Sequence, residues 1–285
     1  MKLPVVVGVD GSAQSAAAAE WAGYQARRSG SGLRLLHAVR PPRPGAATGR
    51  SERLPDPVGE LHVRIARLLP ELDVSLVRCA GDALHVLSAA AEHSELLVLG
   101  SRGLGGFAGP LVGSVALDVV AVAHRPVVLV RSGMASEHAG SGEVVLGVEG
   151  SRPCEEVIGF AFEEAAKRGA VLRAVHGGLP PAGPYLTKAP LPQPQIRIAL
   201  AAAQVQQLQD CLDRWSDKFP EVRTSVELMD HGAARALVQA SASADLLVVG
   251  RRIPERSLPG LHLGPVAHAV VHHAHCPVAV VPHTA

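Results

Sequence analysis

The sequence predicts an α/β protein built from two tandem, doubly wound domains, each with a five-stranded parallel sheet in the strand order 3-2-1-4-5. The first observation behind this prediction is that short, continuous Val and Leu runs alternate with amphipathic stretches of helical length. Continuous apolar runs are typical of strands buried on both faces, and β–α alternation implies parallel strands joined by right-handed crossovers. The second observation is that the whole pattern occurs twice.

Several segments of the first half return in the same order in the second half. The opening VVVGVDGS (Val5–Ser12) returns as VVLGVEGS (Val144–Ser151), and VALDVVAVAHRPVVLV returns as VAHAVVHHAHCPVAVV. Ordered matches of this kind indicate a duplication. We expect one domain at residues 1–131 and a second at 143–285, joined by the small, polar linker Ser132–Glu143.

The elements of the first repeat follow from this pattern in order. A valine run opens the repeat as a strand, and the alanine-rich AQSAAAAEWAGYQARRSG after a D-G-S turn predicts the first helix. A second apolar run and a proline-rich loop come next, followed by further alternating helices and strands. We expect strands near residues 4–9, 33–39, 73–78, 95–100 and 126–131, and helices near 13–29, 57–69, 82–93 and 113–124.

Composition excludes several classes of protein. The 285 residues are 47% hydrophobic but only 3% aromatic, so we expect an aliphatic core. With 27 basic and 26 acidic residues, the net charge of +1 creates no global field to recruit nucleic acid or an anionic membrane. The four cysteines lack CxxC spacing, which argues against a disulfide framework or a zinc site, and there is neither a signal-type segment nor a long uncharged apolar run. We therefore expect a soluble, cytoplasmic protein.

The stretch GSRGLGGFAGPLVGS, Gly100–Ser114, is the strongest functional signal. It lacks the lysine of a Walker A loop, and its GxGxxA match follows the fourth strand, whereas a dinucleotide fingerprint belongs in the turn after the first strand. A plain flexible loop is one remaining interpretation. The other is a phosphate cradle of the pattern G-x2-G-x9-G-S. Gly100 would end a strand, where the missing Cβ lets a ligand approach the backbone, and Gly113 and Ser114 would open a helix whose free N–H groups attract an anion.

Together, VVVGVDGS, the G-x2-G-x9-G-S loop and the closing HRPVVLV resemble the universal stress protein family in its tandem two-domain form, over essentially the whole chain. The resemblance implies an adenine nucleotide alpha hydrolase-like fold that binds ATP, with or without Mg²⁺. It places the phosphates on the glycine loop and the adenosine near the first two strand ends.

The resemblance also assigns roles to individual residues. Gly8 would form the floor of the site, Asp10 would meet the ribose or adenine side, and Val39 would offer backbone contacts to adenine. The residues implied for the triphosphate are Gly100, Ser101, Arg102, Gly103, Gly113, Ser114 and Val115. Asp10 has a second interpretation, because Asp and Gly are common turn residues in any case.

The last strand of each repeat, PVVLV or PVAVV, would be an apolar sheet edge, and bare edges invite pairing. We expect the two repeats to pair these edges as an intramolecular pseudo-dimer, which the family resemblance also implies. The sequence does not decide whether two whole chains form a homodimer.

The second repeat departs from the phosphate pattern. Its loop reads GRRIPERSLPGLHLGP, with Ile253 in place of the second glycine and an arm one residue longer. Pro265 replaces the closing serine and has neither a hydroxyl nor a backbone N–H, while Glu149 replaces Asp10. We therefore predict one competent nucleotide site, in the first repeat. Three arginines could attract phosphates, although we favour a solvated or inter-domain charged cluster; they are Arg251, Arg252 and Arg256.

No catalytic residue and no metal site are predicted. Two of the histidines near the last helix have the i,i+4 spacing of a metal pair, but without HExxH or a nearby carboxylate we interpret the group as surface or interface residues. These histidines are His268, His272, His273 and His275. There is no GxSxG motif and no residue poised to activate water.

We expect an ATP-binding regulator of the stress response with at most slow ATP hydrolysis and an unknown protein partner. One alternative is a nucleotide-independent interaction protein of the same fold. Another is an enzyme on a related scaffold. An ATP pyrophosphatase should show an SGGxDS-type loop where this chain has VDGSAQS, and an electron-transfer flavoprotein-like protein should co-purify with flavin.

Overall fold

The computed structural model describes residues 2–40, 56–103, 112–133, 142–149, 154–177, 194–229, 232–253 and 263–284, and the side chains of all of these except 194–201. It divides into two compact units, residues 1–139 and 140–285, and each unit is described by itself. Most of the predicted linker lies outside the described residues. Glu143, which we assigned to the linker, is instead the first residue of strand β6.

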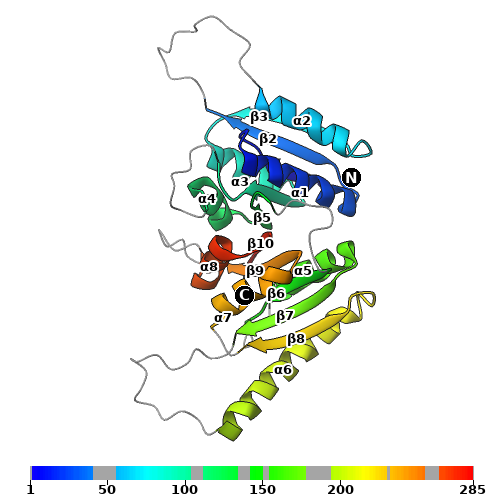
Figure 1. Ribbon diagram of the computed structural model, residues 1–285, viewed down its shortest axis with the longest axis vertical. Helices are drawn as coiled ribbons and strands as arrows, with labels where there is room; N and C mark the ends of the chain where they lie inside the picture. The colour runs from blue at the N-terminus through cyan, green and yellow to red at the C-terminus, as the bar shows by residue number, and fades with distance from the viewer. Residues whose placement is uncertain are drawn as a thin grey trace, which may run out of the picture. The chain divides into compact units, whose positions relative to one another are not determined.

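The first unit contains five parallel strands in the order β3-β2-β1-β4-β5, which confirms the predicted order 3-2-1-4-5 (Figure 1). The strands are β1 (Val5–Gly8), β2 (Leu33–Val39), β3 (Val74–Ala80), β4 (Leu96–Gly100) and β5 (Val127–Val130). β1 lies between β2 and β4, and its residues Val5, Val6 and Val7 are fully buried. Burial on both faces explains why this strand reads as a continuous apolar run and not as an alternation.

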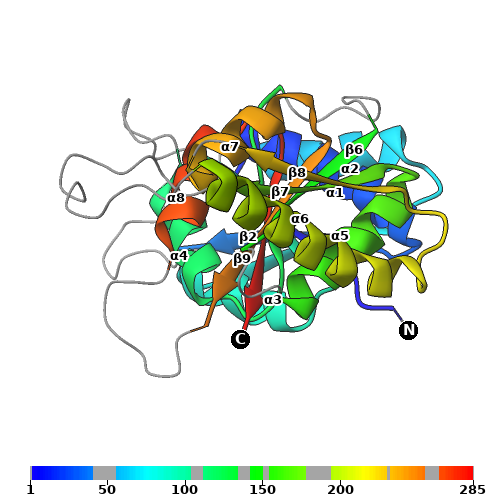
Figure 2. The ribbon, with the colours of Figure 1, turned by 90° about the horizontal axis from the view of Figure 1, so that it is seen from below.

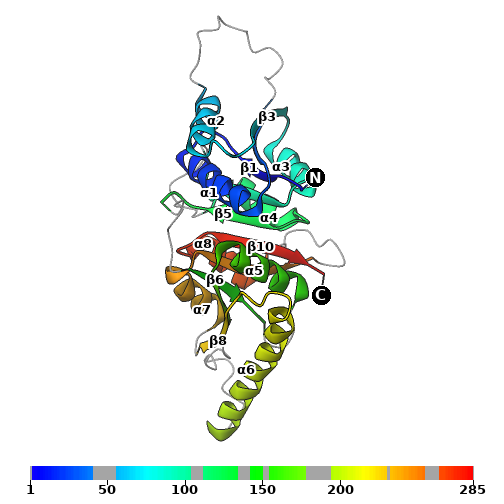
Figure 3. The same cartoon turned by 90° about the vertical axis from the view of Figure 1, so that its right-hand side faces the viewer.

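Helices cover both faces of this sheet. They are α1 (Ala13–Ser29), α2 (Pro57–Leu68), α3 (Ala83–Glu92) and α4 (Ser114–Val122). α1 packs with α2, and α3 packs with α4 on the opposite face (Figure 3). The bounds of α1 follow from local chemistry. Ser12 caps its start by accepting the N–H of Ser15 at 3.1 Å, and Gly30 ends it with a left-handed φ of 60°.

The second unit repeats the plan, with the strand order β8-β7-β6-β9-β10 and all strands parallel. Its strands are β6 (Glu143–Gly147), β7 (Val171–Gly177), β8 (Thr224–Met229), β9 (Leu246–Arg252) and β10 (Val278–His283). Its helices are α5 (Glu155–Arg168), α6 (Pro194–Ser216), α7 (Ala233–Ala240) and α8 (Pro265–His273). α5 packs with α6, as Figure 2 shows, and α7 packs with α8.

The described core is largely aliphatic, as the composition predicts, but the second unit adds an aromatic cluster. The fully buried ring of Phe162 on α5 lies 6.1 Å from the Trp215 ring and 5.8 Å from the Phe219 ring, measured between centroids. Gly159 makes this approach possible, because a Cβ at that position would lie 2.5 Å from the Trp215 ring. The cluster therefore anchors the C-terminal end of α6 to α5.

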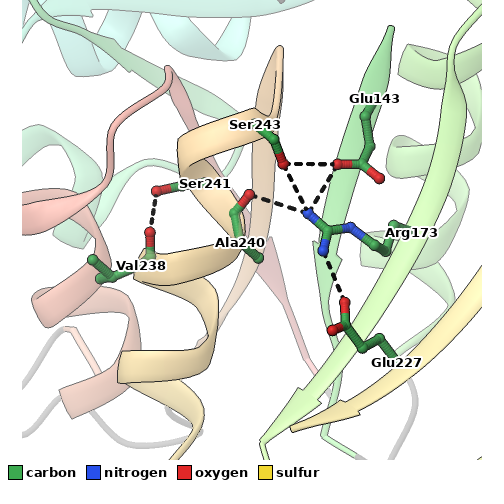
Figure 4. A network of polar contacts seen from close by, with 7 residues as sticks. All are labelled: Glu143, Arg173, Glu227, Val238, Ala240, Ser241 and Ser243. Carbon is green, nitrogen blue, oxygen red and sulfur yellow. Dashed lines mark hydrogen bonds and ion pairs between the residues drawn. The ribbon is translucent and has the colours of Figure 1, made fainter. Parts of the chain in front are cut away.

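A polar network ties β7 to its neighbours in the second unit (Figure 4). The Arg173 guanidinium donates to the Glu143 carboxylate on β6 and to the Glu227 carboxylate on β8, each at 2.8 Å. It also donates to the carbonyl of Ala240 at the end of α7 and to the hydroxyl of Ser243. One planar donor group thus links three strands and a helix terminus.

Two expectations from composition can be compared with the described residues. All four cysteines are free; Cys79 is half-buried, whereas Cys154, Cys211 and Cys276 are buried. In the described ranges, no helix has the length and apolar character needed to cross a membrane.

Candidate functional site

A pocket of about 500 Å³ opens at the carboxyl ends of β1, β2 and β4 in the first unit, where the start of α4 closes it. This is the point where the strand order reverses, and doubly wound sheets bind ligands there. Eight of the ten predicted site residues line this pocket. They are Gly8, Asp10, Gly100, Arg102, Gly103, Gly113, Ser114 and Val115.

The D-G-S turn after β1 holds Asp10 in place. Its Oδ1 atom accepts the N–H of Ser12 at 3.0 Å, and Gly11 makes the turn possible with a φ of 86°. The other carboxylate oxygen faces the β4 loop, since a Cβ at Gly103 would lie 2.5 Å from Asp10 Oδ2. The turn role of Asp10 and its position on the pocket wall are therefore compatible.

The start of α4 supplies hydrogen-bond donors to the pocket. The helix begins at Ser114, with Gly113 as an N-cap that makes no side-chain hydrogen bond, and Leu117 N–H to Gly113 carbonyl (3.1 Å) is its first helical bond. By helix geometry, the N–H groups of Ser114, Val115 and Ala116 have no partner inside the helix. All three residues line the pocket, so the positive end of the helix faces it.

Gly100 and Gly113 differ in whether the fold itself requires a glycine. A Cβ at Gly100 would lie 2.8 Å from the Gln14 carbonyl carbon and 2.9 Å from the Ser15 nitrogen, both backbone atoms at the start of α1. The reason given from the sequence for Gly100, access for a ligand, is therefore incomplete: helix packing alone already requires glycine there. At Gly113 a Cβ would meet nothing closer than 3.6 Å, and its φ of −73° suits any residue. The fold does not require glycine at this position.

The two remaining predicted residues lie outside the pocket lining. Ser101 is buried; its N–H donates to the Val130 carbonyl at 2.8 Å, and its carbonyl accepts the N–H of Gly113 at 2.7 Å. It thereby fixes the distance between the end of β4 and the start of α4. Val39 is 39% exposed, and its carbonyl accepts the N–H of Gly81 at 3.0 Å. The adenine contacts predicted for Val39 stay a prediction.

The end of β2 contributes residues that sequence reasoning did not assign to the site. His37 and Ala38 line the pocket, together with Leu36 and, from α3, Leu87. The Nδ1 atom of His37 is buried and has no hydrogen-bond partner in the described structure. A signal for His37 was present, since the second strand of each repeat ends near a histidine.

The second unit has a pocket of about 650 Å³ at the equivalent place, but its phosphate side is built differently. Helix α8 begins with Pro265, which lines the pocket and offers no N–H. β9 and β10 also continue past Gly250: Arg251 pairs with Pro282, Arg252 pairs with His283, and the Ile253 N–H donates to the His283 carbonyl at 2.7 Å. Strand pairing thus continues where the first unit's chain leaves the sheet.

The two described arginines of this loop differ in exposure. Arg251 is only 4% exposed, so the solvated half of the expectation, which was a solvated or inter-domain cluster, does not hold for this residue. Arg252 is exposed, and its guanidinium nitrogen lies 3.8 Å from a carboxylate oxygen of Glu149. Arg256 lies outside the described residues.

Two histidines of α8 lie close together: the ring centroids of His268 and His272 are 4.6 Å apart. In the described ranges, no group of three or more His, Cys, Asp or Glu side chains is placed to hold a metal ion.

Comparisons with known proteins agree with the resemblance found in the sequence. The model of the universal stress protein family matches residues 1–131 and again 141–282. A universal stress protein of Mycobacterium tuberculosis is 34% identical over 295 residues, covering 97% of this chain and 96% of its own. Another from Mycolicibacterium smegmatis is 29% identical over 97% of this chain and 96% of its own.

The crystal structure of a universal stress protein from Archaeoglobus fulgidus shares the fold; it covers 98% of both chains with a TM-score of 0.65 at 16% identity. A universal stress protein solved in complex with cAMP is 27% identical over 47% of this chain and all of its own, with a TM-score of 0.35.

Proposed function

The chain belongs to the universal stress protein family, and on that premise we propose that it is an ATP-binding regulatory protein with one competent nucleotide site, in its N-terminal repeat. The nucleotide would lie in the pocket at the ends of β1, β2 and β4. Its phosphates would meet the loop from Gly100 to Ser114, and its adenosine would lie toward β2.

The observation that carries this proposal is the start of α4. Gly113 leaves open a space that the fold does not need, and the N–H groups of the first helical turn face the same pocket. Donors in this arrangement fit the oxygen atoms of a phosphate chain, because a helix N-terminus combines free N–H groups with a positive potential. Arg102 adds a cationic side chain to the same wall.

The asymmetry of the repeats supports a single site. In the second unit Pro265 removes one donor at the first position of α8, and continued β9–β10 pairing replaces the turn that brings Gly103 toward Asp10. An anion at that place would find fewer hydrogen bonds and would lose more of its hydration than it regains.

A regulatory role, and not rapid turnover, agrees with the chemistry of the pocket wall. Among the described residues that line the pocket, Asp10 is the one carboxylate, and one of its oxygens is occupied by the Ser12 N–H. Bound ATP would supply a hydrolysable phosphate chain, but the lining residues that the structure describes do not include the set of acidic and basic groups that phosphoryl-transfer enzymes place around it.

The test is a nucleotide analysis of freshly purified protein, comparing the wild type with Asp10→Ala and Gly113→Glu. We expect adenine nucleotide to co-purify with the wild type and to be lost from Gly113→Glu, whose carboxylate would occupy and repel the phosphate region. Phosphate release from added ATP should be slow or absent. Equal nucleotide content in wild type and Gly113→Glu would refute the proposed location of the site. Absence of nucleotide from the wild type, with no binding of added ATP, would favour the nucleotide-independent interaction protein instead.

A further inference from the structure

Helix α8 of the second unit presents two histidines side by side. His268 and His272 are four residues apart, a spacing that places two side chains one above the other along a helix. Their ring centroids lie 4.6 Å apart, so the two imidazoles are in contact. Another face of α8 carries the buried Ala267, Val270 and Val271, and the helix packs against β9, β10 and α7. The histidine pair therefore lies on a fixed support.

The fold does not require histidine at either position. By the repeat alignment, α4 of the first unit has Leu117 in place of His268 and Ala121 in place of His272. Both helices have nine residues, and both begin after a glycine N-cap. The same helix thus forms with apolar residues at the two positions, so the construction of the helix gives no reason for the two imidazoles.

Two neutral imidazoles at this spacing are a bidentate ligand for a divalent transition metal ion. Imidazole nitrogen suits Zn²⁺, Cu²⁺ and Ni²⁺, whereas Mg²⁺ and Ca²⁺ prefer oxygen ligands. An HExxH motif with a third protein ligand belongs to a hydrolytic zinc centre, and α8 contains neither that motif nor a carboxylate. Two protein ligands suffice for a weaker site, in which water completes the coordination and the ion exchanges with the solvent.

The surroundings of the pair favour a cation. His272 lies in the last turn of α8, where the aligned peptide dipoles of the helix create a negative potential. His268 is exposed, so its ring can rotate to admit an ion beside the buried Nε2 atom of the half-buried His272. The exposed ring thus provides an entry path, and the half-buried ring provides a fixed anchor.

We propose that His268 and His272 form a binding site for one exchangeable divalent transition metal ion of the class of Zn²⁺, Ni²⁺ and Cu²⁺. Chelation by both rings binds the ion about 100-fold more tightly than one imidazole does, because the second bond forms within the same helix. The bound ion stabilises the second unit, since the unfolded chain does not hold the two rings together. The site is independent of the proposed nucleotide site, which lies in the other repeat.

Equilibrium dialysis of the full chain against Ni²⁺ tests this proposal, without an affinity tag, without nucleotide and in a buffer that does not bind metals. The first repeat supplies the matched substitutions. His268→Leu and His272→Ala should each weaken the tightest Ni²⁺ site by about 100-fold, because each leaves a single imidazole. His273→Val is the control, with Val122 as its counterpart in α4, and should bind Ni²⁺ as the wild type does. Its ring points about 100° away from His272 around the helix, and the two ring centroids lie 6.3 Å apart.

One tight Ni²⁺ per chain that is lost in His268→Leu and in His272→Ala, but kept in His273→Val and in excess Mg²⁺, supports the proposal. No tight site in the wild type, wild-type affinity in either pair variant, or an equal loss in His273→Val overturns it. Should a variant unfold, ring-nitrogen NMR signals of the wild type decide instead: Zn²⁺ should shift those of His268 and His272 first, and earlier shifts at other histidines overturn the proposal. ATP binding by the wild type is a separate measurement, so either proposal can fail while the other stands.

Discussion

Alanine at Gly100 and alanine at Gly113 should have opposite consequences, although the sequence pattern treats the two glycines alike. At residue 100 the new Cβ would lie 2.8 Å from the Gln14 carbonyl carbon and 2.9 Å from the Ser15 nitrogen. Carbon atoms in good contact lie about 3.5–4.0 Å apart, and backbone atoms of a helix start cannot rotate away. We therefore expect Gly100→Ala to destabilise the first unit by about 1–3 kcal/mol, the usual cost of overpacking.

At residue 113 the same change should leave stability nearly unaltered. The new Cβ would have no neighbour closer than 3.6 Å, and the backbone at φ −73° and ψ 150° accepts alanine. Alanine is a poorer N-cap than glycine, but it also lowers the entropy of the unfolded chain by a similar amount, so the net change should stay within about 0.5 kcal/mol. ATP binding should nevertheless weaken by about tenfold, because the methyl group enters the space proposed for phosphate.

Thermal unfolding without nucleotide and calorimetric titration with ATP measure the two effects separately. For a unit of this size, 1 kcal/mol corresponds to about 3 °C, so Gly100→Ala should lower the Tm of the first unit by about 3–9 °C. A neutral Gly100→Ala, a Gly113→Ala as destabilised as Gly100→Ala, or unchanged ATP binding by Gly113→Ala would refute the reasoning.

Three further predictions concern the second unit. Burial raises the pKa of the Cys154 thiol from 9.0 to about 11. Alkylation of Cys154 by iodoacetamide at pH 8, measured by peptide mapping, should therefore be about 100-fold slower than in the unfolded chain. Alkylation of Cys154 before the half-buried Cys79 would contradict this prediction. Burial lowers the pKa of His283 in the folded protein below 6.5, its value in the unfolded chain. The unfolding free energy should therefore fall as the pH drops below 6.5 and level off below the folded pKa. His283→Gln should remove this part of the pH dependence, and an unchanged pH profile in that variant would refute the prediction. Arg173→Met removes the guanidinium that pairs with the Glu143 and Glu227 carboxylates and should lower the unfolding free energy by about 1–3 kcal/mol, measured by urea denaturation. A loss under about 0.5 kcal/mol would show that the network of Figure 4 contributes little.

The sequence predicts the fold well because its signals are local. The buried run Val5–Val7, the D-G-S turn that caps α1 and the helix opening at Gly113 and Ser114 each combine residue type with position, and the structure has all three. Repetition adds to this, since an element seen weakly in one half is seen again in the other.

Features that depend on distant partners are not predictable in this way. Gly100 is required by Gln14 and Ser15, far away along the chain, and a glycine at a strand end gives no sign of which neighbour it accommodates. The continuation of β9 through Arg251 and Arg252 is similar, because two arginines after a buried strand read as a loop until their pairing with β10 is known. His37 was visible as a residue but not as part of the pocket, since a lone histidine at a strand end has many possible roles.

The central claim is one ATP site per chain, in the N-terminal repeat. Equilibrium dialysis of the full chain against labelled ATP, with Gly113→Glu measured beside it, tests this most directly. We predict saturation at one ATP per chain for the wild type and no saturable binding for Gly113→Glu. Saturation at two per chain, or one site that survives in Gly113→Glu, would contradict it.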